Sequence, residues 1–138
     1  MTIKDTTENK HMSCSEDIVS IFEAILNAEC EIDQDKEHFW TIGLNSKNRI
    51  KYIELVSLGS LISSLVHPRE VFRLAVMKGV ASIAAVHNHP SGDPAPSQDD
   101  IEITARLKQA GDILGIKMLD HIIIGKNKHY SFLNNKLL

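Results

Sequence analysis

One short apolar run, Val80 to Val86, constrains the fold more than any other stretch of the chain. Its seven residues, VASIAAV, are almost continuously apolar, which is typical of a strand buried on both faces of a sheet. A helical pattern precedes the run and ends at Gly79, and a second helical pattern follows it after a proline-rich loop. A buried strand between two helices predicts an α/β domain.

Further periodic segments extend this pattern along the chain. The expected helices are 15–26, with Ser15 as N-cap and apolar residues at helical spacing, 68–78, opened by Pro68 and ended by Gly79, and 97–114, capped by Ser97 and ended by Gly115. The expected strands are 39–44, 50–58, 80–86, 118–124 and 130–132, and a turn-like cluster at 45–48 makes the first two a hairpin. The order α-β-β-α-β-α-β-β predicts a mixed sheet flanked by helices.

The domain organisation follows from length and from the first residues. A chain of 138 residues has the length of one ordinary domain. Residues 1–14 lack apolar periodicity, so we expect a disordered N-terminal arm there and a single domain over residues 15–138.

Charge and composition exclude several classes of protein. The formal net charge of −3 gives no excess of Lys and Arg to neutralise phosphates, so a strongly basic nucleic-acid module is not expected. Neither a membrane-spanning apolar run nor a signal peptide is found. The two cysteines, Cys14 and Cys30, form no disulfide framework, which suits a cytoplasmic protein.

The candidate chemistry lies in the loop after the buried strand, HNHPSGDPAPSQDD. In an extended chain the side chains of His87 and His89 lie on the same side. With Ser97 as N-cap, Asp100 falls in the first turn of the next helix. Two imidazoles and a carboxylate form a donor set typical of catalytic zinc. Two alternatives stay open: a hydrogen-bonded histidine pair without metal, and Asp100 only as the capping partner of Ser97.

These residues also carry a resemblance. The pattern H-x-H-P-x6-S-x-x-D, from His87 to Asp100, resembles the signature of the JAMM (JAB/MPN) metalloprotease domains. With REVFRLA upstream and LDHIIIG downstream, the chain is most similar to the RadC branch, over about residues 16–138. The resemblance implies a deaminase-like α/β fold, with Zn²⁺ held by His87, His89 and Asp100 and a water in the fourth position.

The resemblance further implies a catalytic glutamate near the start of a strand. Glu37 fits that position, and Glu54 and Glu70 are its rivals. In the implied reaction, amide hydrolysis, Glu37 takes a proton from the zinc-activated water and returns it to the leaving amine, while Ser97 donates a hydrogen bond to the oxyanion. His121 either orients a metal ligand or is a hydrogen-bonded core histidine, and we favour the core histidine.

Three functions are therefore considered. The first is a zinc metallopeptidase or isopeptidase acting on an unknown protein or peptide. The second is a protein associated with DNA repair or recombination, which the charge does not support. The third is a catalytically silent module that binds a partner. The sequence leaves the substrate and the oligomeric state open.

Overall fold

The computed structural model describes residues 11–12, 14–29, 34–59 and 66–138. The helices are α1 (Ser15–Asn27), α3 (Pro68–Lys78) and α4 (Gln98–Leu114). The strands are β1 (Glu37–Leu44), β2 (Ile50–Gly59), β3 (Ser82–Asn88), β4 (Lys117–Ile124) and β5 (His129–Ser131). This order confirms the α-β-β-α-β-α-β-β prediction for the described part of the chain.

The five strands form one mixed sheet with the spatial order β2-β1-β3-β4-β5. β1 pairs antiparallel with β2 and with β3, β3 pairs parallel with β4, and β5 pairs antiparallel with β4. The parallel pair is joined through α4, as a crossover between parallel strands requires. The predicted fold class, a mixed sheet flanked by helices, is confirmed.

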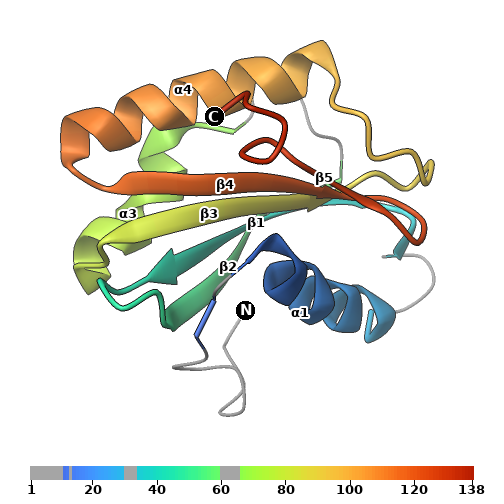
Figure 1. Ribbon diagram of the computed structural model, residues 1–138, viewed down its shortest axis with the longest axis horizontal. Coiled ribbons are helices and arrows are strands. Elements are labelled where there is room, and N and C mark those ends of the chain that lie inside the picture. The colour runs from blue at the N-terminus through green and yellow to red at the C-terminus, as the bar shows by residue number, and fades with distance from the viewer. Residues whose placement is uncertain (1–10, 13, 30–33, 60–65) are drawn as a thin grey trace.

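Helices cover both faces of the sheet (Figure 1). α1 packs on one face, where Phe22 lies against Trp40 with ring centroids 5.0 Å apart. α3 and α4 cover the other face, where Phe72 and Leu107 belong to the same buried cluster as Ile83. Because β3 has helices on both sides, all of its residues are buried, which explains why the run from Val80 to Val86 is almost continuously apolar.

Several predicted boundaries differ from the observed ones by one or two residues. β3 extends to Asn88 instead of ending at Val86, because His87 pairs with Phe39 on β1 and with Ile123 on β4. β1 begins at Glu37, which pairs with Gly59 at the end of β2. The N-cap of α1 is Cys14, whose backbone N–H donates to the Asp17 carboxylate at 3.3 Å, and the predicted cap, Ser15, is the first helical residue.

Residues 1–10 and 13 of the predicted arm lie outside the described residues, and the arm stays a prediction there. The described residues of the arm, which was expected to be disordered, are in part packed against the domain. Met12 is buried in the α1-side core, and its backbone N–H donates to the Asn48 carbonyl at 2.9 Å. His11 forms a β-bridge with Arg49. The packed part of the chain therefore includes residues before Ser15.

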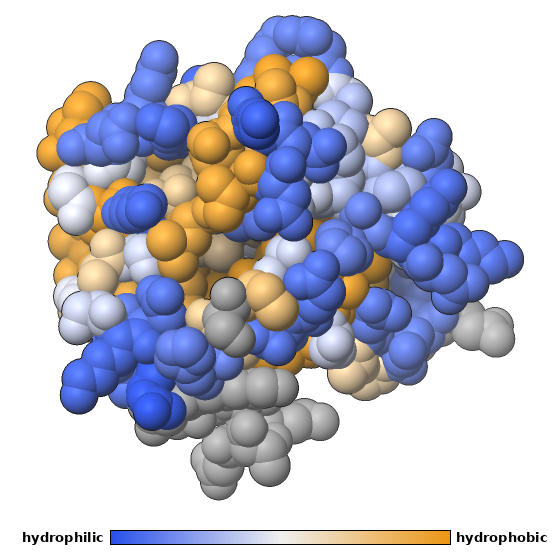
Figure 2. Space-filling view, in the orientation of Figure 1, coloured by the Kyte–Doolittle hydropathy of each residue, from blue (hydrophilic) through white to orange (hydrophobic). Residues whose placement is uncertain are grey.

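Figure 2 shows hydrophilic side chains over much of the viewed face, interrupted by apolar areas. The most exposed large apolar side chains in the described residues are Ile113 on α4 and Met77 on α3. None of the helices described is both long and apolar enough to span a bilayer.

The turn between β4 and β5 contacts the loop that follows β3. The Lys126 backbone N–H donates to the Gly92 carbonyl at 2.8 Å. A Cβ placed on Gly125 would lie 2.4 Å from the Gly92 carbonyl oxygen and 2.8 Å from Pro94 Cδ. Only glycine permits this approach of two backbones, so the hairpin turn fixes the position of the loop.

We expect Gly125→Ala to lower the free energy of unfolding by about 1–3 kcal/mol, since a methyl group would be forced against the Gly92 carbonyl. The control is Gly79→Ala, which is strained by the φ of +64° but has no atom within 4 Å of the added Cβ. Denaturant unfolding gives the stabilities, and amide NMR shifts of residues 89–96 should change only in Gly125→Ala. Equal stability of Gly125→Ala and the parent would contradict the contact.

Candidate metal centre

The pairing of β3 fixes the first of the two motif histidines. His87 lies opposite Phe39 on β1 and beside Ile123 on β4, and its side chain is fully buried. Alternation along β3 turns His87 to the face that α3 and α4 cover, together with Ile83 and Ala85. The imidazole therefore projects under the start of α4.

The loop after β3 holds the second histidine. The His89 backbone N–H donates to the Ile124 carbonyl at 2.9 Å, which keeps the chain beside β4 for one more residue. The Gly92 N–H donates to the His89 carbonyl at 2.9 Å, so a tight turn follows. The side chain is partly buried, and its Nδ1 lies 2.9 Å from the backbone carbonyl of Asp93.

The start of α4 supplies the carboxylate. Ser97 is the N-cap, and a capping box joins it to Asp100: the Asp100 N–H donates to Ser97 Oγ at 3.1 Å, and the Ser97 N–H donates to Asp100 Oδ2 at 2.8 Å. The carboxylate is thereby turned back over the helix N-terminus and is 97% buried with its side chain facing the histidines. Asp100 is thus the capping partner of Ser97, but capping is not its only contact, because its carboxylate also faces the two histidines.

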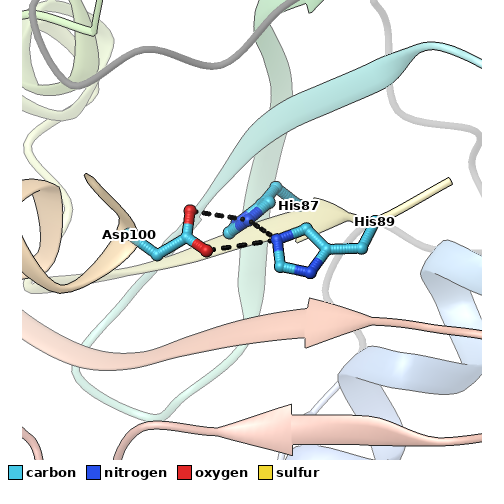
Figure 3. A group of neighbouring side chains, drawn as sticks. All are labelled: His87, His89 and Asp100. Carbon is cyan, nitrogen blue, oxygen red and sulfur yellow. Dashed lines mark hydrogen bonds and ion pairs between the residues drawn. The ribbon is translucent and has the colours of Figure 1, made fainter. Parts of the chain in front are cut away.

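The three side chains converge on one point, as Figure 3 shows. His87 Nε2 lies 3.1 Å from His89 Nε2 and 3.1 Å from Asp100 Oδ1, and His89 Nε2 lies 3.1 Å from Asp100 Oδ2. With one atom taken from each residue, the three ligand atoms lie within 4.8 Å of one another. Ligand atoms of a tetrahedral zinc ion are separated by roughly 3.3 Å, so the spacing fits a shared ion.

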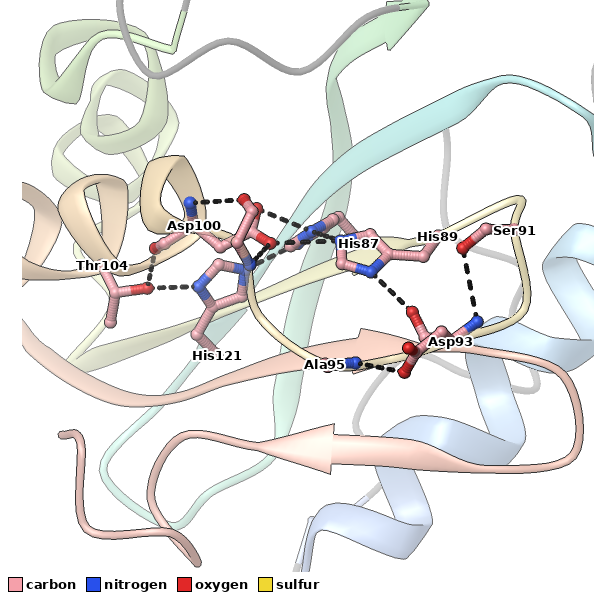
Figure 4. Close-up of polar contacts among 9 residues, drawn as sticks. His87, His89, Ser91, Asp93, Ala95, Asp100, Thr104 and His121 are labelled. Atoms are coloured by element: carbon pink, nitrogen blue, oxygen red, sulfur yellow. Dashed lines mark hydrogen bonds and ion pairs between the residues drawn. The ribbon is translucent and has the colours of Figure 1, made fainter.

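The hydrogen bonds behind the histidines indicate which ring nitrogens carry protons. A backbone carbonyl only accepts, so His89 Nδ1 donates to Asp93 and the lone pair of a neutral His89 is on Nε2. His87 Nδ1 lies 2.8 Å from His121 Nε2 on the far side of its ring (Figure 4). Two facing Nε2 atoms and a carboxylate repel one another unless a proton or a cation lies among them, and the residues therefore fit a metal ion.

The pKa shifts of Asp100 and His89 are those expected of a site that favours a positive charge. Burial alone would raise the pKa of Asp100, but hydrogen bonds to His87 and His89 outweigh it and hold that pKa well below the usual range. The hydrogen bond to Asp100 raises the pKa of His89, with the Asp93 carbonyl and the charge of Glu37 adding to the effect. Both shifts favour a positive charge among the three side chains.

The three candidate glutamates lie in different surroundings. Glu37 is the first residue of β1, two residues before the partner of His87, so alternation places it on the same face as that histidine. Its charge acts on His89. Glu54 lies on β2 opposite Thr41, with a carboxylate oxygen 4.0 Å from an Arg73 nitrogen, and Glu70 is exposed in the first turn of α3. Of the three, Glu37 is the one whose charge raises the pKa of His89.

Comparison with known proteins agrees with the fold and the motif. Residues 12–137 match the family model of the RadC-like JAB domain. The chain belongs to the RadC-like JAB domain family. The predicted resemblance to the RadC branch is thereby confirmed.

Relatives of this RadC-like JAB domain are similar over much of the chain. A UPF0758 protein of Desulforudis audaxviator is 61% identical over 97 residues, which is 70% of this chain and 42% of that protein. One from Desulforamulus reducens is 48% identical over 125 residues, 91% of this chain and 53% of that protein. The chain thus spans about half the length of these curated relatives.

One positioning contact was not expected from the sequence, and a second had been the less favoured alternative. Asn88, interpreted as a loop residue, ends β3: its Oδ1 accepts from the His38 N–H at 2.6 Å, and its Nδ2 donates to the Lys36 carbonyl at 3.1 Å. These bonds tie the start of β1, where Glu37 lies, to the histidine strand. His121 was favoured as a core histidine, and it is fully buried, but it also contacts His87. The one feature of the sequence that could have indicated this contact is that His121 lies on β4, the strand beside β3.

The raised pKa of His89 predicts a pH dependence of stability in the metal-free protein. Protonated His89 stabilises the fold fully below its unfolded pKa of about 6.5, and this contribution is lost as the pH rises through the raised folded value. Thermal unfolding of chelator-treated parent and His89→Gln should show a parental advantage in mild acid that shrinks at alkaline pH. An advantage that stays constant or grows with pH would contradict the interpretation.

Proposed function

We propose that this RadC-like JAB domain is a zinc-dependent metallopeptidase or isopeptidase. The observation that carries the proposal is the convergence of His87 Nε2, His89 Nε2 and the Asp100 carboxylate at 3.1 Å separations, with the other side of each imidazole occupied by a hydrogen bond. A donor set of two histidines and one carboxylate leaves a fourth zinc position open for chemistry.

When bound, zinc supplies a Lewis acid that activates water and polarises a carbonyl. Glu37 then acts as general base and acid: it accepts a proton from the attacking water and returns it to the leaving amine. Its place at the first residue of β1 supports this role, because Phe39 and Trp40 are buried behind it and fix the direction of the strand. Hydrolysis by this route forms no covalent intermediate with the protein.

Ser97 has a donor available for the same reaction. Its Oγ accepts the Asp100 N–H, and among the described residues no acceptor for its hydroxyl hydrogen is found. A hydroxyl accepts and donates at once, so Ser97 can cap α4 and still stabilise a developing oxyanion. Its exposure beside the buried Asp100 leaves room for a substrate carbonyl to approach.

The proposed substrate is a peptide or isopeptide bond of a protein, and the proposed location is the cytoplasm. The net charge of −3 favours this substrate class over a nucleic acid. Retention of every ligand type in the motif favours an active site over a silent partner-binding module, because a site without function has no need of a converging donor set.

The central test separates metal binding from catalysis. Glu37→Gln keeps the shape of the side chain and removes the base, so it should bind zinc as tightly as the parent while losing hydrolysis of peptide and isopeptide substrates. His89→Ala should lose the metal, since two remaining protein ligands bind zinc poorly. Zinc content and turnover are measured on each purified variant.

Two matched controls make this result specific to Glu37. Glu70→Gln changes an exposed carboxylate in α3 and should leave both zinc content and turnover at the parental level. Glu54→Gln should cost stability through its contact with Arg73 but should keep activity. Parental turnover of Glu37→Gln would remove the general-base assignment and leave the three ligands in place.

Substitution of Ser97 separates capping from catalysis. Ser97→Ala should lower stability by about 1 kcal/mol through the lost cap. Ser97→Gly, a tolerated cap, should lose only a few tenths of a kcal/mol. Both lack the hydroxyl, so both should lose turnover by about 10²–10³-fold if it stabilises the oxyanion. Full turnover in Ser97→Gly would leave Ser97 a structural role alone.

A further inference from the structure

His121 lies behind the candidate ligand His87, and its surroundings fix the orientation of its ring. The side chain is fully buried on β4. It stacks on Phe132, with ring centroids 4.7 Å apart and an interplanar angle of 7°, and meets the edge of Phe39 at 5.7 Å. Both aromatic contacts are apolar, so the two ring nitrogens find their partners in the ring plane alone.

Those partners form a continuous chain of hydrogen bonds. Thr104 on α4 donates its hydroxyl hydrogen to the Asp100 carbonyl at 2.7 Å. Its oxygen also lies within hydrogen-bond distance of His121 Nδ1, and since its hydrogen is already used, it accepts there. His121 is then protonated on Nδ1 and has its lone pair on Nε2, which accepts from His87 Nδ1–H at 2.8 Å.

We propose that His121 is a positioning residue of the metal centre, which accepts the Nδ1–H of His87 and thereby directs the Nε2 lone pair of His87 at the ion. This inference rests on the proposed zinc site. Metal-ligating histidines commonly donate their second nitrogen to a carboxylate or a carbonyl, which fixes tautomer and orientation. Here the acceptor is the neutral imidazole of His121. The His87 ring is therefore oriented without a further negative charge beside the metal.

The chain of bonds also links two ligands to each other. It runs from His87 through His121 and Thr104 to the backbone of Asp100, whose carboxylate faces His87 again at 3.1 Å (Figure 4). These contacts form a closed ring that joins β3, β4 and the first turn of α4. The separation of the ligands is therefore held by the protein before a metal binds.

The test measures zinc affinity and geometry rather than turnover. His121→Leu fits the apolar contacts with Phe39 and Phe132 but leaves the His87 Nδ1–H without an acceptor. His121→Gln can place a carbonyl oxygen near the position of Nε2. Zinc dissociation constants come from competition with a chromophoric chelator, and the visible spectrum of the Co²⁺-substituted protein reports the ligand geometry.

We expect His121→Leu to bind zinc about 10–100-fold more weakly than the parent, with an altered Co²⁺ spectrum, and His121→Gln to recover most of the affinity. Parental affinity and spectrum in a folded His121→Leu would overturn the inference and leave the zinc site standing. Equal losses in the Leu and Gln variants would also overturn it. A parent that binds no zinc, with His89→Ala indistinguishable from it, would remove the proposed function as well.

A second measurement needs no His121 variant, should His121→Leu fail to fold. In the zinc-loaded parent, long-range ¹H–¹⁵N NMR should show His87 protonated on Nδ1 and metal-bound through Nε2. Thr104→Val, which keeps the shape and removes the hydroxyl, should weaken zinc binding relative to the parent. An unprotonated His87 Nδ1 in the loaded parent would overturn the inference.

Discussion

Repulsion among two imidazole nitrogens and a carboxylate is the constraint on which the rest of this structure depends. Three groups that compete for the same proton lie 3.1 Å apart at one end of the sheet, and two of them are buried. A fold keeps such an arrangement only where the surrounding structure determines it. Strand pairing sets the backbone position of His87, a turn after β3 sets that of His89, and the helix cap sets that of Asp100.

The same interactions that build the fold also prepare the site. The capping box of Ser97 and Asp100 starts α4, and it turns the carboxylate toward the histidines. Asn88 is the last residue of β3, and its side chain accepts a hydrogen bond from the His38 N–H at the start of β1, next to Glu37. The turn between β4 and β5 contacts the loop that contains His89, because the Lys126 backbone N–H donates to the Gly92 carbonyl. Stability and preorganisation therefore depend on shared contacts, and variants at these positions are expected to affect both.

Local patterns in the sequence predicted most of this. Proline and glycine signals placed α3 and the end of α4, and the S-x-x-D spacing put Asp100 in the first helical turn. The boundary of β3 was wrong because His87 and Asn88 look like loop residues, and only pairing with β1 and β4 makes them strand. The His87–His121 contact spans 34 residues and depends on the parallel register of β3 and β4, which no local pattern encodes.

A crystal structure of the zinc-soaked protein, with anomalous data collected on both sides of the zinc edge, tests the central claim most directly. The account predicts one anomalous peak per chain, about 2 Å from His87 Nε2, His89 Nε2 and an Asp100 oxygen, with Glu37 near it but not bound to it. Zinc found only at other surface groups, with the three side chains still facing one another across an ion-free site, would contradict the account.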